Sequence, residues 1–543
     1  NYHALSVLNY THRGKVDLIY IDPPYNTGNR DFRYNDNFVD KEDGDRHTKW
    51  LSFMHRRLEL AKNLLKDTGV IFISIDDNEV AQLKLLCDKV FGENNFIANL
   101  IWQKSKKGDA KFISITHEYI AVYVKDKYLT LLNGVWRQRK PGADDVLEHY
   151  QTLREKFGDK HDTISSEIRT WYRKLPAGDA RKNHKHYNFS DKRGLYFADN
   201  FAGPDDGRKS RPRYDIIHPV TGKPCKKPST GWRWEEEKTK WALEQDPPRI
   251  HFGEDENTIP NRKSYLFEID SQPFSSVFYQ DGRKGTLDLE AIVGKGKMPF
   301  PKNVEVLQDI FRLLTHTQKD ATIIDFFAGS GTTGHAVLEL NEEDSGRRQF
   351  ILVTNNEVTD KTRQQLLNEG KSEAEIEEQG ICRAVTYPRL KKVIEGYTNA
   401  KGEKVAGLGG KLRYFQTDFV PAEGSLDQVS YNLRRRCTEM LCFRENVFSP
   451  LVDSEPYEIY RDHDRVLAIL HDEHPQHKNA LRVALQKMSG VNECKLYVFT
   501  LDREVNAADY EDFQNVTLEN VPAKIIDLYK REVMRLSAVM EED

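Results

Sequence analysis

Apolar residues in the first 125 positions alternate between runs of strand length and stretches with helical spacing. The apolar runs are residues 16–21, 70–75 and 120–124. From Leu51 to Leu65, apolar residues recur every three or four positions, which predicts a helix that Gly69 ends. Residues 78–90 predict another helix. Apolar strands separated by helices indicate a parallel sheet that is covered on both faces.

This regular pattern breaks off at about residue 126 and resumes at about residue 298. The later part predicts helices over 302–316, 332–341 and 363–379, and strands over 322–326 and 350–354. The tail predicts a strand over 466–470, a helix over 477–489 and a strand over 495–499. Residues 126–275 are rich in Lys, Arg, Trp, Tyr, Gly and Pro, so we expect an insertion with short strands and long loops.

The composition narrows the class of protein. Hydrophobic residues make up 38% and charged residues 31% of the 543 positions, as in a soluble protein with sizeable cores. No stretch approaches the roughly 18 consecutive apolar residues that a membrane span needs, and no charged-then-apolar leader is seen. The six cysteines form no CxxC pair, which fits a reducing compartment and gives no support to a zinc site. We therefore expect a cytoplasmic protein with no membrane partner and no metal.

Charge is distributed unevenly along the chain. Residues 101–250 contain 31 Lys and Arg against 21 Asp and Glu, a net charge of +10. The remaining residues contain 50 against 64, a net charge of −14. A basic segment in an acidic protein is typical of a polyanion-binding surface, with a merely solvated charged surface as the alternative.

A glycine-rich loop, "DFFAGSGTTGHAV" (325–337), follows one predicted strand and opens a predicted helix. Gly329 and Gly331 allow a tight turn and a close approach to a ligand, and the N–H groups at the helix start suit an anion. Glu357, just past the next strand, could accept the two ribose hydroxyls of an adenosine-containing cofactor. The absence of a GxGxxG fingerprint and of a Walker lysine argues against NAD and ATP and favours S-adenosylmethionine. A tight turn without a ligand is the alternative.

The stretch "DPPYNTGN" (22–29) ends the first apolar strand. The proline after Asp22 forces an extended backbone, which fixes the carboxylate at the edge where open α/β sheets bind ligands. Pro24 holds the carbonyl of Pro23 in place as a second acceptor, and Tyr25 offers a face on which a ring can stack. Two acceptors beside a stacking platform suit an exocyclic amine such as adenine N6. Hydrogen bonds to these acceptors would free the nitrogen lone pair for attack on a methyl sulfonium, once the base is flipped out of the duplex.

The DPPY corner, the FAGSG loop and their order along the chain resemble the amino-methyltransferases that act on DNA. With the corner first, a basic insertion next and the cofactor loop last, the chain is similar to the β-class, a circular permutation of a seven-stranded Rossmann-like fold. "DPPYNTGN", "FISIDDNE" (72–79), "THEYIAVYVK" (116–125), "HPVTGKPCKKPSTGWRW" (218–234) and "LRYFQTDFV" (412–420) together resemble the modification subunits of type III restriction–modification systems. In that family a Gly-Asp pair stands before the segment similar to "NYHALSVL" (1–8), so we expect part of the cofactor pocket to precede Asn1.

The resemblance implies a fold class and a division into parts. We expect a circularly permuted, Rossmann-like α/β methyltransferase sheet with an inserted target-recognition domain and an α/β C-terminal domain. The expected parts are a catalytic half (1–125), the target-recognition domain (126–275), a cofactor-binding half (276–400) and a C-terminal domain that binds a partner or packs (401–543).

The resemblance also implies which residues form the active site. The expected catalytic residues are Asp22, Pro23, Pro24 and Tyr25. The expected cofactor-binding residues are Asp325, Phe327, Ala328, Gly329, Ser330, Gly331, Thr332, Glu357 and Lys302, with a surface position as the alternative for Lys302. The candidate DNA contacts are Arg211, Arg213, Lys223, Lys226, Lys227, Trp232, Arg233 and Trp234.

The reaction expected from these motifs is methyl transfer from S-adenosylmethionine to N6 of a flipped adenine in double-stranded DNA. A cytosine-N4 methyltransferase uses the same geometry, but the aspartate of the corner favours adenine where a serine would favour cytosine. A DNA-recognition subunit that guides a nuclease partner is the alternative from another class. The expected partners are duplex DNA, a second copy of the chain, and a helicase–nuclease restriction subunit.

Overall fold

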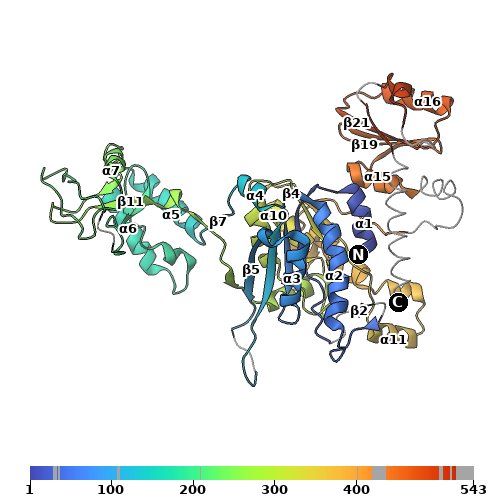
Figure 1. Ribbon diagram of the computed structural model, residues 1–543, viewed down its shortest axis with the longest axis horizontal. Helices are drawn as coiled ribbons and strands as arrows, with labels where there is room; N and C mark the ends of the chain where they lie inside the picture. The colour runs from blue at the N-terminus through green and yellow to red at the C-terminus, as the bar shows by residue number, and fades with distance from the viewer. Residues whose placement is uncertain are drawn as a thin grey trace. The chain divides into compact units, whose positions relative to one another are not determined.

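The computed structural model describes residues 1–28, 33–34, 37–106, 110–207, 210–399, 401–418, 436–499, 505–513 and 516–520. The chain forms two compact units. One combines Asn1–Val135 with Ser275–Asp543, and the other is Trp136–Phe274 (Figure 1). Among the described residues, no helix is both long and apolar enough to cross a membrane.

The larger unit is built on a seven-stranded sheet with the order β13-β5-β6-β4-β1-β14-β15. Its strands are β1 (Val16–Ile21), β4 (Leu65–Ile75), β5 (Phe96–Gln103), β6 (His117–Val124), β13 (Val277–Tyr279), β14 (Thr322–Asp325) and β15 (Gln349–Leu352). The central strand β1 pairs in parallel with both β4 and β14, so that Ile19 lies between Ile71 and Ile324. The carboxyl ends of β1 and β14 therefore lie side by side at one edge of the sheet.

Helices cover both faces of this sheet (Figure 1). They include α1 (Tyr2–Thr11), α2 (Arg46–Leu64), α3 (Val80–Phe91), α9 (Val304–Thr315) and α10 (Thr332–Asp344). On one face, Met54 of α2 and Leu83 of α3 share a fully buried core with Ile73 of β4. On the other face, the ring of Tyr20 meets Phe311 of α9 edge-on at 6.3 Å. The continuous apolar strands of the sequence are thus buried from both sides.

One strand direction differs from the expectation of a parallel sheet. Strand β6 runs antiparallel to β4 and to β5, and β5 itself was not predicted. The connection from β5 to β6 spans only residues 104–116, and the structure describes no helix in residues 104–106 and 110–116 of it. A short connection without a crossover helix returns the chain antiparallel. The sheet therefore keeps the expected α/β architecture with one reversed strand.

The remaining elements of this unit are shorter. They are β2 (Arg33–Tyr34), β3 (Asn37–Phe38), α4 (Lys127–Leu132), α8 (Arg283–Val293), α11 (Asp360–Asn368), α12 (Glu373–Glu377), α13 (Tyr387–Glu395), β16 (Gly396–Thr398) and β17 (Lys404–Ala406). The single charged helix predicted over 363–379 is in fact two helices. Gly370, with a φ of +77°, ends the first, and Ser372 caps the second in a capping box with Glu375.

The tail of the chain folds into a second sheet with the order β18-β19-β20-β21-β22. Its elements are α15 (Thr438–Glu445), β18 (Pro450–Asp453), β19 (Tyr457–Asp462), β20 (Arg465–Leu470), α16 (Pro475–Gln486), β21 (Glu493–Val498) and β22 (Val516–Asn520). It packs against the first helix of the chain, where the Arg444 guanidinium lies 4.8 Å from the ring centre of Tyr10. His12 and Phe443 also meet, with ring centres 4.8 Å apart.

The unit Trp136–Phe274 is more regular than the expected short strands and long loops. It contains α5 (Ala143–Phe157), α6 (His161–Lys174), α7 (Glu236–Leu243) and a sheet of β8 (Phe189–Ser190), β9 (Leu195–Asp199), β10 (Ile250–His251) and β11 (Asn261–Tyr265). Helix α6 buries Ile164, Ile168 and Tyr172 at helical spacing and exposes charged residues between them. Strands β7 (Gln138–Arg139) and β12 (Ser271–Gln272) pair antiparallel, so the chain enters and leaves this unit through neighbouring strands.

Candidate active site

The DPPY corner begins directly after β1 and is fixed by hydrogen bonds from neighbouring elements. The carbonyl of Pro24 accepts from Trp50 Nε1 at 2.8 Å. Asn26 is buried with a φ of +58°, and its amide donates to Glu79 Oε1 at 2.6 Å. The side chain of Asp22 is 29% exposed. The corner is therefore held in place while its carboxylate stays open to a ligand.

Lys302 connects this corner to the rest of the site. Its ammonium group donates to the Tyr25 hydroxyl at 2.6 Å and to Glu118 Oε1 at 2.8 Å, and lies 3.2 Å from Asp22 Oδ1. Lys104 donates to the other oxygen of Glu118 at 2.7 Å. Lys302 is only 10% exposed, so this is a largely buried cluster of two carboxylates, two ammonium groups and one hydroxyl. The surface alternative for Lys302 is therefore wrong.

Burial and charge set the ionisation of this cluster. Burial raises the pKa of Asp22. The Glu118 carboxylate raises the pKa of Asp22 further, although the Lys302 ammonium acts against both effects. Burial would also raise the pKa of Glu118, but Lys302 and Lys104 hold it below its ordinary value. Burial would lower the pKa of Lys302, but the two carboxylates outweigh this and raise it. Burial, Asp22 and Glu118 raise the pKa of Tyr25 far above its ordinary value. Lys302 is thus an ammonium and Tyr25 a neutral hydroxyl at neutral pH.

The glycine loop follows β14 at the same edge of the sheet. Gly329 and Gly331 have φ values of +47° and +78°, which side chains other than glycine adopt at a cost. The Asp325 carboxylate accepts from Phe327 N at 2.9 Å and from the Thr333 hydroxyl at 2.6 Å. Burial raises the pKa of Asp325 to about 7. The loop thus folds back over its own aspartate before α10 begins.

Arg389 of α13 donates hydrogen bonds to this loop, and no sequence pattern indicates this role. Its Nη1 donates to the Ser330 carbonyl at 3.2 Å, and to the Ser330 and Thr332 hydroxyls at 3.0 Å each. The side chain is fully buried, and burial lowers its pKa to about 10. The contacts span 57 and 59 positions of the chain, so only the folded structure reveals them.

The other expected cofactor residues lie around the same loop. Ala328 N donates to the Val353 carbonyl at 3.1 Å, and the ring of Phe327 lies 5.9 Å from that of Phe53. Glu357 is exposed past the end of β15, and its carbonyl accepts from the backbone of Ile381 at 3.0 Å. The Thr332 hydroxyl donates to the carbonyl of Lys302 at 3.4 Å. The residue that bonds the DPPY corner therefore also contacts the loop.

The candidate DNA contacts fall into exposed and buried groups. Arg213, Lys223, Lys226, Lys227 and Arg233 are exposed. Arg211 and Trp234 are half-buried, and both Asp206 oxygens accept from Arg211 Nη2 at 2.7 Å. Trp232 is 0% exposed, donates to the Tyr214 carbonyl at 2.9 Å and packs against Phe201. The expectation for Trp232 is therefore corrected: this side chain belongs to the core of its unit and does not face a ligand.

A known protein family matches the part of the chain that carries these residues. Residues 16–358, which include the corner, Lys302 and the glycine loop, match the N6_N4_Mtase family model, described as DNA methylase. The chain belongs to the DNA methylase family. This methylase is 34% identical over 386 residues to the type III restriction-modification enzyme EcoP15I Mod subunit of Escherichia coli, covering 66% of this chain and 58% of that protein.

Two further relatives are a type III modification subunit and a type II methyltransferase. The EcoPI Mod subunit of Escherichia phage P1 is 31% identical over 454 residues, covering 77% of this chain and 65% of that protein. The type II methyltransferase M.KpnI of Klebsiella pneumoniae is 32% identical over 373 residues, covering 67% of this chain and 80% of that protein. The methylase spans 51% to 65% of the length of three type III Mod subunits that it matches. The resemblance to type III modification subunits is confirmed.

Proposed function

We propose that this chain transfers a methyl group from S-adenosylmethionine to N6 of an adenine flipped out of duplex DNA. The observation that carries the proposal is the parallel pairing of β1 with β14. This pairing brings the DPPY corner and the glycine loop to one edge of the sheet, where open α/β sheets bind their ligands. A base held by the corner would then lie beside a cofactor held by the loop, as direct transfer requires.

In this proposal the corner binds and orients the amine. Asp22 and the Pro23 carbonyl accept the two N–H groups, and Tyr25 stacks against the ring. Lys302 already donates an N–H to the Tyr25 hydroxyl and lies at hydrogen-bond distance from Asp22, so it stands where a substrate amine would donate. Glu118 keeps Lys302 within the site when the base takes over the Asp22 oxygen. The new nitrogen–carbon bond then leaves a surplus proton on nitrogen, and Asp22 is placed to accept it.

The glycine loop leaves little room for side chains at its two positions of positive φ. A Cβ on Gly329 would lie 3.0 Å from the methyl group of Met298, and one on Gly331 would lie 3.1 Å from Thr386 Cγ2, so side chains at these positions would crowd the loop. We propose that Asp325, Phe327, Ala328, Gly329, Ser330, Gly331, Thr332, Glu357 and Lys302 hold S-adenosylmethionine. When bound, it supplies an electrophilic methyl group on sulfonium.

Adenine is proposed over cytosine because a carboxylate, and not a hydroxyl, stands first in the corner. The names of the type III relatives also favour a modification subunit. We further propose that the chain works in the cytoplasm as a homodimer that recognises duplex DNA and assembles with a helicase–nuclease restriction subunit. Duplex recognition is assigned to the unit Trp136–Phe274.

The test is to incubate the chain with labelled S-adenosylmethionine and duplex DNA, and to identify the modified nucleoside by mass spectrometry. N6-methyladenine is the expected product. N4-methylcytosine would replace the adenine assignment by the cytosine alternative. Specific DNA binding with no labelled base would favour a recognition subunit without transfer activity.

A further inference from the structure

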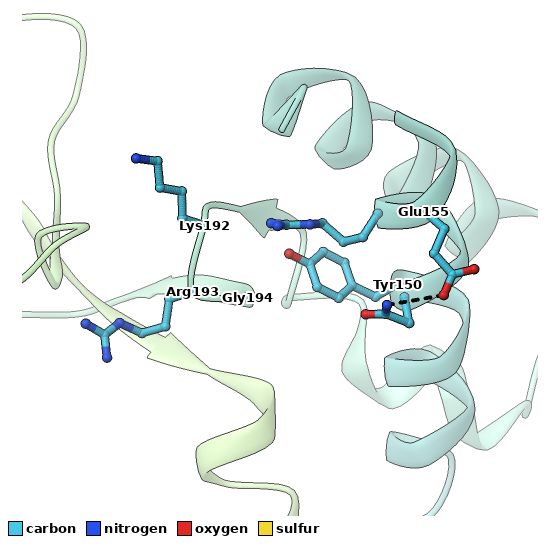
Figure 2. Close-up of a pocket in the computed structure, with 7 residues that line it drawn as sticks. Tyr150, Glu155, Lys192, Arg193 and Gly194 are labelled. Carbon is cyan, nitrogen blue, oxygen red and sulfur yellow. Dashed lines mark hydrogen bonds between the residues drawn. The ribbon is translucent and has the colours of Figure 1, made fainter. Parts of the chain in front are cut away.

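A shallow pocket of about 330 Å³ lies on the unit Trp136–Phe274, between helix α5 and the tip of the β8–β9 hairpin (Figure 2). Its lining residues are Tyr150, Gln151, Arg154, Glu155, Lys192, Arg193 and Gly194. Three of the seven are cations and one is an anion. None of them belongs to the DNA candidates that the sequence suggested in residues 211–234, so the pocket is a separate feature of the unit.

Asp191 makes the hairpin tip rigid. Its Oδ1 accepts from the backbone N–H groups of Arg193 at 2.9 Å and Gly194 at 3.2 Å, which closes the turn. Its Oδ2 accepts from the Lys263 ammonium at 2.8 Å and the Tyr265 hydroxyl at 2.7 Å. The negative charge of Asp191 is thus neutralised by Lys263 and does not compete for the cations of the tip.

Lys192 and Arg193 project from this fixed turn (Figure 2). Within the described part of the chain, neither forms an ion pair with a carboxylate, and the Arg193 guanidinium lies 5.8 Å from the ring centre of Tyr265. The two side chains point to different sides of the turn (Figure 2), so each can contact a separate anionic group.

Helix α5 forms the opposite wall. Arg154 donates to the Asp191 carbonyl at 3.0 Å and lies 3.3 Å from Asp159, so it is held against the hairpin. The Tyr150 hydroxyl bonds with Ser190 Oγ at 3.0 Å. Glu155, the one anion of the lining, accepts from Gln151 at 3.2 Å. Arg154 is therefore a third cation that lines the pocket, and its position is fixed by the fold.

We propose that this pocket, the Arg154–Lys192–Arg193 cleft, binds the DNA backbone, with Lys192 and Arg193 on separate phosphates. The inference rests on the proposed function, because that function requires the chain to hold duplex DNA. The unit as a whole carries 27 Lys and Arg against 23 Asp and Glu, so its overall charge alone is a weak argument. The local arrangement is what favours a phosphate, since phosphate contacts set the position of a duplex without reading its sequence.

The test is the salt dependence of DNA binding by the 543-residue chain, measured by fluorescence anisotropy with a labelled duplex. Each lost phosphate contact lowers the slope of log affinity against log salt by about 0.9. We expect the double variant Lys192→Ala/Arg193→Ala to lower this slope by roughly 1 to 2, and to weaken binding about 10- to 100-fold at 0.1 M salt. The charge-preserving variant Lys192→Arg/Arg193→Lys should keep the wild-type slope.

The matched control is Arg173→Ala/Lys174→Ala, which removes an adjacent pair of exposed cations at the end of α6 in the same unit. A slope for the Lys192/Arg193 double variant equal to that of the wild type or of this control would overturn the proposal. Methyl transfer at saturating DNA is measured in parallel. If the wild-type chain shows no methyl transfer while the Lys192/Arg193 double variant shows the expected change in slope, the proposed function is overturned and the phosphate site remains supported.

Discussion

The ammonium group of Lys302 lies 3.2 Å from the carboxylate of Asp22, although 280 positions of the sequence separate them. The same ammonium reaches Tyr25, so one cation bonds the first and last residues of the DPPY corner. An N–H donor is thus already present where the proposed substrate amine would donate.

Asp22→Ala removes one of the two acceptors that the proposed reaction needs. We expect methyl transfer to fall by about 100-fold or more, the usual effect of losing one well-placed polar group at a reacting centre. DNA affinity should stay within about threefold, because the contacts that position the duplex are assigned in this proposal to the unit Trp136–Phe274. Single-turnover transfer and anisotropy on the same preparation measure the two effects. If methyl transfer and DNA affinity fall equally in Asp22→Ala, and also in the more conservative Asp22→Asn, the corner has a structural role and no catalytic one.

Glu118→Gln tests the electrostatics of the cluster through the pH profile. Glu118 helps to raise the pKa of Asp22, and the proposed reaction needs Asp22 as a carboxylate. Transfer is therefore lost as the pH falls through this raised pKa. Removing the charge of Glu118 lowers the pKa of Asp22, and it also leaves Lys302 free to pair more fully with Asp22. The acidic limb of the single-turnover rate should move to lower pH, and an unmoved limb would contradict this account.

Gly331→Ala tests the glycine loop. The φ of +78° strains any other residue, and the added Cβ would meet Thr386 at 3.1 Å. We expect the dissociation constant for S-adenosylmethionine, measured by calorimetry, to rise about 10-fold, since roughly 1.4 kcal/mol of strain gives that factor. The matched control is Gly14→Ala, because Gly14 has a φ of +66° and nothing within 4 Å of the added Cβ. Equal effects of the two substitutions would remove the loop from the cofactor site.

Trp232→Ala tests whether Trp232 stabilises the core of the smaller unit. Emptying a fully buried tryptophan site should lower the free energy of unfolding of this unit by about 3 to 5 kcal/mol. Its exposed neighbour Arg233→Ala should change the same quantity by no more than about 0.5 kcal/mol. Urea unfolding followed by tryptophan fluorescence and circular dichroism measures both. A stable Trp232→Ala chain with weakened DNA binding would restore Trp232 as a DNA contact.

The α/β architecture could be predicted from sequence because apolar runs alternate with stretches of helical spacing. The two motif loops could be predicted because prolines and glycines restrict the backbone locally. The direction of β6 could not, since an apolar run reads the same in either direction. The sequence alone does not place Trp232, because a tryptophan in a basic, glycine-rich segment has the same local signature in a core and at an interface. Only the fold distinguishes the two.

The partners of Lys302 were also beyond the sequence. Glu118 lies 14 positions from Lys104 and 184 positions from Lys302, and no local pattern links residues so far apart. The cleft at Lys192 and Arg193 depends in the same way on Arg154 of another element. Sequence motifs therefore located the two candidate loops, while the residues that hold them in place and set the charge around them are seen only in tertiary contacts.

The position of β1 between β4 and β14 also bears on how the chain is made. Ile19 pairs with Ile324, which the ribosome adds 305 residues later. At a synthesis rate of about 5 to 20 residues per second, one edge of this apolar strand stays unpaired for roughly 15 to 60 s until β14 has been made. An unpaired apolar edge is a template for pairing with other chains. Translation of the intervening residues is thus the interval in which the nascent chain most needs protection from aggregation.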